Sequence, residues 1–321
     1  MKLNGLHHIT AVTSQAQQNV DFYTGVLGLR LVKKTVNQDD VSAYHLFYGD
    51  EVGSAGTEVT FFDWPHIGPN RAGPGSIAQV ALRAPGSALE WWAQRLTEHG
   101  VSHSGLTEFH GHTVLNFSDP EGQQLALVDD EGVPGGVPWQ QSPVPVEYGL
   151  RGLYGASLIV KDLRPDAFVL TEIMGYRQVA EYPSTTKANE RTVVFALDGG
   201  GPGKEITVIE QPDQPYGQLG RGGVHHIAFR TPNGEEQAQW MEHIHSFGLG
   251  TSGLVDRYYF QSLYFRIPGG ILFEIATDGP GFATDEAVEQ LGERLALPPF
   301  LEPHRAKIEA GLKPVTPYHL K

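Results

Sequence analysis

The chain has 321 residues, 40% of them hydrophobic, which is long enough and apolar enough for two domains of ordinary size. Its formal net charge is −14, from 23 Lys plus Arg against 37 Asp plus Glu, and no basic stretch offers a footprint for nucleic acid. It contains no cysteine, which excludes disulfides, thiolate metal ligands and thiol nucleophiles.

No apolar stretch is long enough to span a bilayer, and the segment MKLNGLHHIT lacks the apolar core of a secretory signal. We therefore expect a globular protein of the cytoplasm that has neither a membrane nor a nucleic acid as its partner. The sequence leaves a homo-oligomer open.

Four segments of the chain share one pattern, at residues 6–64, 75–130, 152–212 and 221–278. Each predicts a strand, then a helix, then several more strands. The opening strands are LHHITAV, SIAQVALRA, LYGASLIV and VHHIAFR, which are rich in residues that favour sheets.

The predicted helices carry apolar residues at helical spacing, and each ends at a glycine that can adopt the left-handed cap conformation. These glycines are Gly28, Gly100, Gly175 and Gly248. The segments then close with GTEVTFFDW, EGQQLALVDD, GKEITVIEQPD and GGILFEIATD, each with a glycine before an apolar run.

A single βαβββ unit cannot bury its own sheet face, so an α+β fold is expected in which four such modules pair into two cup-shaped mixed sheets. We predict an N-terminal half at 1–135, a Pro- and Gly-rich linker at 136–149, a C-terminal half at 150–278 and a tail at 279–321. In the tail we expect a helix at 285–295 and a short one at 304–312. This tail would cap a cup or support an oligomer.

Histidine doublets recur in two of the opening strands, as His7-His8 and as His225-His226, and Glu274 lies in the last apolar run. Two imidazoles and one carboxylate on one side of a metal leave the opposite positions open, as is typical of non-haem Fe(II) oxygenases. A structural zinc site would usually fill four positions and favour thiolates. The pattern therefore indicates catalysis.

The second and third modules lack these donors. At the doublet positions they have Ala78-Gln79 and Tyr154-Gly155, and at the position of Glu274 the first three modules have Thr60, Ala126 and Thr207. Side chains alternate along a strand, so only one histidine of each doublet should face the metal, and spacing alone leaves open which one. A salt bridge to an arginine is the alternative for Glu274. His103, His110 and His112 are expected on a surface loop or strand.

The segments DFYTGVLGLRLVKKTVNQDD, GGVHHIAF and LPPFLEPHR, together with residues 255–282, resemble ring-cleaving dioxygenases that act on hydroquinones and chlorohydroquinones. These enzymes belong to the vicinal oxygen chelate superfamily, which includes glyoxalases, bleomycin resistance proteins and extradiol dioxygenases. The resemblance covers nearly the whole chain and is most specific at 255–282.

The resemblance implies that His8, His226 and Glu274 bind Fe(II), although Mn(II) suits the same ligands and other divalent metals can occupy such a site. It implies further that His7, Thr10, His225, Arg257 and Tyr264 orient an aromatic diol and assist proton movement. The implied reaction is extradiol-type ring cleavage, with both atoms of O₂ inserted into a hydroquinone-type aromatic, chlorinated or methylated rings included.

Two other functions fit the same fold. A glyoxalase-like metal-dependent isomerase or lyase would typically need a further carboxylate, where this chain has Thr60. A non-catalytic protein that binds an aromatic drug would not need the complete set of donors.

Overall fold

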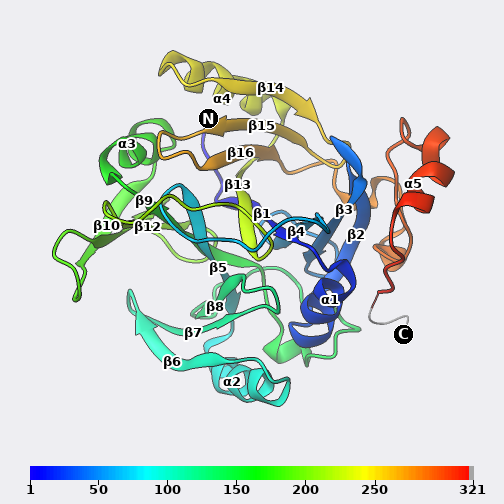
Figure 1. Ribbon diagram of the computed structural model, residues 1–321, viewed down its shortest axis with the longest axis horizontal. Coiled ribbons are helices and arrows are strands. Elements are labelled where there is room, and N and C mark those ends of the chain that lie inside the picture. The colour runs from blue at the N-terminus through cyan, green and yellow to red at the C-terminus, as the bar shows by residue number, and fades with distance from the viewer. Residues whose placement is uncertain (318–321) are drawn as a thin grey trace.

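The computed structural model describes residues 1–317, and its sixteen strands fall into four βαβββ modules (Figure 1). The first module contains β1 (Leu6–Thr13), α1 (Ala16–Val20) with a π-helical continuation (Asp21–Val26), β2 (Arg30–Asn37), β3 (Asp40–Gly49) and β4 (Glu58–Asp63). The second contains β5 (Ser76–Ala84), α2 (Leu89–Glu98), β6 (His103–Phe109), β7 (His112–Ser118) and β8 (Gln124–Asp129).

The third module contains β9 (Leu153–Val160), α3 (Leu163–Phe168) with a π-helical continuation (Val169–Ile173), β10 (Arg177–Pro183), β11 (Arg191–Ala196) and β12 (Glu205–Glu210). The fourth contains β13 (Gly223–Thr231), α4 (Gly234–Ser246), β14 (Thr251–Asp256), β15 (Gln261–Arg266) and β16 (Leu272–Thr277). The helices lie on the outside of the sheet (Figure 1).

The modules pair across the length of the chain. Strand β1 pairs antiparallel with β13, so the first and fourth modules form one cup, and β5 pairs antiparallel with β9, so the second and third form the other. The two cups join where Val224 on β13 pairs with Ile77 on β5. The predicted α+β fold of paired modules is confirmed, whereas the division into halves at 1–135 and 150–278 stays a prediction.

The glycines that end the four helical segments have the left-handed conformation that the sequence predicts. Their φ angles are 71° at Gly28, 70° at Gly100, 77° at Gly175 and 80° at Gly248. Each turns the chain from a helix into the next strand, a conformation that costs a residue with a Cβ more than it costs glycine.

Each opening strand contains one extra residue relative to its antiparallel partner, which is a β-bulge. On β1 the extra residue is His7, because Leu6 and His8 pair with the consecutive residues Phe229 and Ala228. On β13 it is His225. The same positions of the other cup hold Ala78 on β5 and Tyr154 on β9, so the four modules share this irregularity.

The tail departs from the prediction between residues 285 and 295, where no α-helix forms. The chain makes short 3₁₀ turns at Phe282–Thr284 and Val288–Gln290, and Leu295 then forms a bridge with Lys34 on β2. Because Asp285 and Glu286 pair with the buried Lys33, this segment follows the edge strand instead of coiling.

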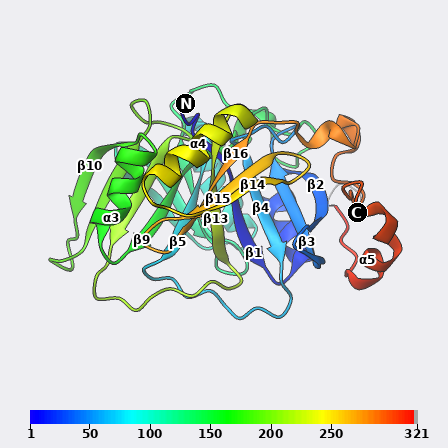
Figure 2. The same cartoon turned by 90° about the horizontal axis from the view of Figure 1, so that it is seen from above.

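The short helix predicted at 304–312 forms as α5 (Arg305–Gly311), at the β2–β3 end of the molecule and far from β10 (Figure 2). Within residues 1–317, no helix has the length and apolar character needed to cross a membrane.

Candidate metal centre

Three donor side chains converge between the first and fourth modules. His226 Nε2 lies 2.9 Å from Glu274 Oε2, His8 Nε2 lies 3.3 Å from the same oxygen, and the two Nε2 atoms are 3.4 Å apart. The pairing of β13 with β1 and with β16 produces this arrangement, because Thr10 pairs with His226 and Ala228 with Glu274. All three donors are buried.

The surroundings of Glu274 fit a bound cation. Neither carboxylate oxygen receives a hydrogen bond from the described residues, and its ion pairs are with His8 and His226, not with an arginine. Burial alone would raise the pKa of Glu274, yet the two imidazoles hold this pKa well below its usual value. A buried carboxylate beside two imidazole nitrogens is a donor set for a divalent metal.

The first histidine of each doublet supports the second. His7 Nδ1 lies 2.9 Å from His8 Nδ1, and His225 Nδ1 lies 2.7 Å from His226 Nδ1. Strict alternation along the strands would point these rings to opposite faces, and the bulges at His7 and His225 bring them together instead. The Nε2 atoms of His8 and His226 thus face Glu274 while their Nδ1 atoms are held from behind.

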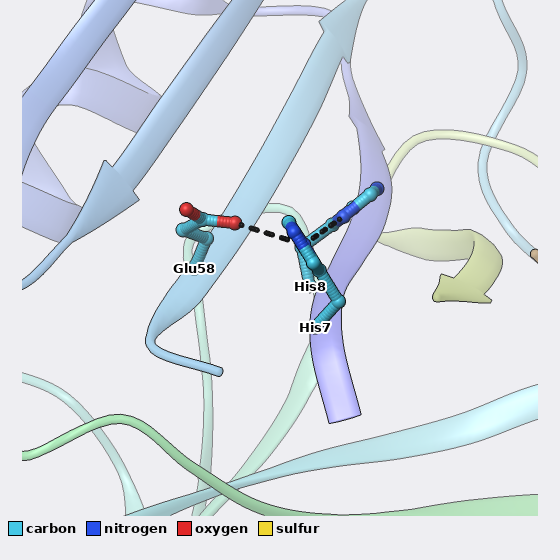
Figure 3. A group of neighbouring side chains, drawn as sticks. All are labelled: His7, His8 and Glu58. Carbon is cyan, nitrogen blue, oxygen red and sulfur yellow. Dashed lines mark hydrogen bonds and ion pairs between the residues drawn. The ribbon is translucent and has the colours of Figure 1, made fainter. Parts of the chain in front are cut away.

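On β1 this support extends one step further. His7 Nε2–H can donate to the Thr277 carbonyl oxygen at 3.1 Å, which leaves His7 Nδ1 to accept a hydrogen bond from His8 Nδ1–H. Figure 3 shows the carboxyl group of Glu58 pointing at the doublet from β4, with Glu58 Oε2 3.4 Å from His7 Nδ1. Burial raises the pKa of Glu58 to about 6.

His7, His8 and Glu58 form a second cluster of metal-type donors that shares His8 with the first. Its two Nδ1 atoms are separated by hydrogen-bond distance. We therefore interpret this cluster as the support of His8 and not as a separate metal site.

A cavity of about 450 Å³, its open mouth included, lies in front of His8 and His226. Its remaining wall is mainly aromatic and polar, with Thr35, Val36, Asn37, Gln38, Asp39, His45, Phe47, Phe62, Arg257, Tyr259, Phe260 and Tyr264. The open side of the donor set thus faces a space suited to a planar ring.

Arg257 and Tyr264 lie side by side in the wall of this cavity. The guanidinium of Arg257 forms two hydrogen bonds with Asp39, at 2.8 and 3.1 Å, and its centre lies 5.5 Å from the ring centre of Tyr264. Tyr264 on β15 pairs with Glu274 on β16. Burial, together with the charge of Glu274, raises the pKa of Tyr264, so its hydroxyl stays protonated.

Sequence reasoning missed His45, which lines the cavity from β3. His45 Nε2 lies 3.0 Å from Thr60 Oγ1, and Thr60 donates to Thr10 Oγ1 at 2.8 Å. Burial holds the pKa of His45 well below its ordinary value. The sequence carried only a weak signal for His45. It is a single histidine in the aromatic strand YHLFYG, two residues before Phe47 and therefore expected on the same face of the strand.

The other residues singled out from the sequence occupy two different places. His7, His225 and Thr10 lie behind the donors and do not line the cavity, in contrast to Arg257 and Tyr264. His103, His110 and His112 belong to the β6–β7 hairpin of the other cup.

The strand register also matches the sequence alignment of the modules. Where β13 and β16 pair Ala228 with Glu274, the equivalent pairs are Thr10 with Thr60, Ala81 with Ala126 and Ser157 with Thr207. The cup formed by the second and third modules therefore has no carboxylate at this position.

The chain is similar to known proteins along almost its whole length. The family model described as Glyoxalase/Bleomycin resistance protein/Dioxygenase superfamily matches residues 5–127 and 156–275. A Bacillus subtilis (strain 168) protein, provisionally named ring-cleaving dioxygenase MhqA, is 49% identical over 98% of this chain and 100% of its own length. The chlorohydroquinone/hydroquinone 1,2-dioxygenase of Sphingobium indicum is 34% identical over 94% of this chain and 93% of its own.

Solved structures show the same fold. The crystal structure of a Bacillus subtilis protein provisionally described as a dioxygenase superposes with a TM-score of 0.89, at 40% identity and 98% coverage of both chains. Glyoxalase I from Zea mays, at 13% identity and a TM-score of 0.63, covers 85% of this chain and 92% of its own, and shares the fold alone. The matched family model and the similarity along almost the whole chain establish that this protein belongs to the glyoxalase/bleomycin resistance protein/dioxygenase superfamily.

Proposed function

We propose that this protein is an Fe(II)-dependent, extradiol-type ring-cleaving dioxygenase that inserts both atoms of O₂ into a hydroquinone-type aromatic. The observation that carries the proposal is the set of three buried donors, His8, His226 and Glu274, whose open side faces an aromatic-walled cavity. The names of its relatives point to the same reaction and the same class of substrate. Mn(II) would suit these ligands as well.

Fe(II), when bound by these groups, supplies open coordination positions and the one-electron chemistry that reaction with O₂ requires. The aromatic side chains of Phe47, Phe62 and Phe260 enclose the substrate ring and keep water away from it. Arg257 offers positive charge to a substrate oxygen, and the Tyr264 hydroxyl offers a hydrogen bond to one.

His45 is our candidate for the group that accepts a substrate proton. The Thr60 hydroxyl donates to Thr10, so its oxygen can accept from His45 Nε2–H. This tautomer leaves His45 Nδ1 unprotonated beside the cavity, and the lowered pKa keeps the imidazole neutral. Thr10 thereby acts as a positioning residue for His45, as His7 and His225 do for the metal-binding histidines.

Two alternatives receive less support. An isomerase on this fold would use a further carboxylate where Thr60 stands, and the hydroxyl there bonds to Thr10 and His45. A binding protein without chemistry would have no use for three buried donors in one place. A cytoplasmic location and a homo-oligomer stay predictions.

The test is anaerobic reconstitution with Fe(II), followed by O₂ uptake and absorbance scans on hydroquinone, methylhydroquinone, chlorohydroquinones and catechol. We expect one O₂ consumed per hydroquinone, with the appearance of a ring-opened chromophore. A preference for catechol would change the substrate class. Substrate binding without O₂ uptake, in protein shown to contain Fe(II), would contradict the proposal.

Substitution tests the assignment of the ligands. Glu274→Gln removes the charge that balances the cation, so iron binding and turnover should both be lost while the circular dichroism spectrum is retained. Glu205→Gln is the matched control, because Glu205 is a buried carboxylate of the other cup. Full turnover in Glu274→Gln would show that the ligands are assigned wrongly.

A further inference from the structure

The cup formed by the second and third modules encloses a cavity of its own, at the place equivalent to the metal centre. It opens between β5, β7 and β8 of one module and β9 and β12 of the other, and measures about 1010 Å³ with its mouth included. The positions equivalent to the metal donors hold Gln79, Gly155, Ala126 and Thr207. These residues do not provide the two imidazoles and the carboxylate of the other cup, so we expect this cavity to bind something other than a metal.

The floor of this cavity is apolar and made of small side chains. Val114, Ala126 and Val128 form a buried cluster with Tyr154, and Ala81 packs against it. The imidazole of His112 meets the ring of Tyr154 edge to face, with ring centres 5.3 Å apart. Such a floor favours a planar, apolar ligand body.

Two polar groups in this wall lack a hydrogen-bond partner among the described residues: the Tyr154 hydroxyl and Nδ1 of His112, which lies 3.4 Å from Glu131 Oε1. Tyr154 is 5% exposed, and its hydroxyl makes no hydrogen bond with the described residues. A buried hydroxyl without a partner is costly, which indicates that something else satisfies it. Burial and then the carboxylate of Glu205 raise the pKa of Tyr154, so the group is a neutral hydroxyl.

The charges around the cavity restrict the ligand further. Its lining includes the carboxylates Glu108 and Glu205 and, among the described residues, neither lysine nor arginine. Glu205 Oε1 accepts from the amide of Gly201 at 2.9 Å, which leaves Oε2 for another donor. An anionic ligand would be repelled, and an ammonium group could not accept a hydrogen bond from Tyr154.

We propose that this second cavity binds an uncharged aromatic compound that carries a hydroxyl group, without metal and without chemistry. A phenolic hydroxyl can accept from Tyr154 Oη–H and can also donate to a carboxylate, and the ring lies on the floor formed by Ala81 and Ala126. The site is independent of the metal centre, so it stands or falls separately from the dioxygenase proposal.

The test is a fluorine NMR titration of the full-length protein with 4-fluorophenol under argon. We expect one equivalent of 4-fluorophenol to bind. Ala126→Phe should abolish this binding, because the new ring fills the floor of the cavity. Tyr154→Phe should weaken it about five- to tenfold, as expected for the loss of one hydrogen bond. Tyr264→Phe, in the cavity of the metal centre, is the matched control and leaves this equivalent unchanged.

Charged probes provide a second arm. Benzoate and benzylammonium should each bind at least about tenfold more weakly than 4-fluorophenol at the Ala126-dependent site. Glu108 and Glu205 repel the carboxylate of benzoate. Benzylammonium cannot accept the hydrogen bond from Tyr154, and its charge must be desolvated. Unchanged binding in a folded Ala126→Phe variant would overturn the proposal, as would tighter binding of benzylammonium. If Ala126→Phe fails to fold, Tyr154→Phe decides, because it removes only one oxygen atom.

Discussion

His7 Nδ1 lies 2.9 Å from Nδ1 of His8, whose Nε2 faces Glu274. The first histidine of the doublet therefore holds the second, and the β-bulge that brings the two rings together is part of the candidate metal centre.

Loss of this support should weaken metal binding without removing a ligand. We expect His7→Ala to lower the affinity for Fe(II) about 10- to 100-fold, because the imidazole of His8 loses the partner that fixes its tautomer and orientation. Anaerobic titration with Fe(II) against a competing chelator measures it. His103→Ala, in the β6–β7 hairpin, should leave the affinity unchanged. Equal affinities in the two variants would remove His7 from the metal centre.

His45 should act on turnover and not on metal binding. We expect His45→Leu to lower kcat about 100-fold with the iron content retained, because the proposed proton acceptor at Nδ1 is lost. Steady-state O₂ uptake and metal analysis of the same sample give both quantities. His112→Leu, in the other cup, is the control with unchanged kcat. A His45→Leu variant with normal kcat would leave the proton acceptor unassigned.

Substitution of Arg257 should lower the catalytic efficiency, kcat/KM. A lysine there cannot form the paired hydrogen bonds with Asp39 or lie flat beside the Tyr264 ring, so the charge in the cavity would no longer be held in place. We expect Arg257→Lys to lower kcat/KM about tenfold. Arg266→Lys is the comparison, since Arg266 is exposed and donates to the Gly270 carbonyl oxygen. Similar kcat/KM values would show that any cation at 257 suffices.

The tail should be anchored through Lys33. This side chain is 0% exposed and forms ion pairs with Asp285 and Glu286. We expect Lys33→Met to lower the free energy of unfolding by about 3 kcal/mol, because Glu286 stays buried while its nearer cation is lost, and Arg294 lies 3.7 Å from its other oxygen. Urea unfolding measures this loss. Lys187→Met, which breaks an exposed pair with Glu190, should cost less than about 1 kcal/mol. Equal losses would contradict the anchoring role.

Asp166 should make stability depend on pH. Burial raises its pKa from 3.8 to about 6 in the folded protein, so the folded state binds the proton more tightly than the unfolded state. Its stabilising contribution is full below pH 3.8 and is lost as the pH rises through about 6. The free energy of unfolding of Asp166→Asn, relative to the unsubstituted protein, should therefore rise over this interval.

Urea unfolding at several pH values tests the sign. Asp162→Asn is the control. Hydrogen bonds with Arg164 lower the pKa of Asp162 to about 2, so its titration changes the free energy of unfolding only at a lower pH than that of Asp166. A constant difference between Asp166→Asn and the unsubstituted protein would mean that Asp166 titrates normally.

Much of the fold and of the donor set is readable from local patterns. The opening strands, the helices that follow them and the capping glycines such as Gly28 and Gly248 depend on neighbouring residues, and these predictions are confirmed. The strict alternation expected at the histidine doublets is wrong, because a bulge interrupts each opening strand there. The tail shows the limit: 285–295 has a helical pattern, but its acidic residues pair with the distant Lys33 and the helix does not form.

The sequence by itself determined that there are four modules and that only the first and fourth carry histidine doublets, because both properties depend on residue identity and short-range periodicity. Only the tertiary structure decided that β1 pairs with β13 and so brings together His8 and His226, which are 218 positions apart. It also decided that the bulges turn each first histidine toward the second, that His45 reaches the cavity and that a second cavity exists. These features depend on which strands pair and in what register, and such long-range contacts leave no periodic trace in the chain.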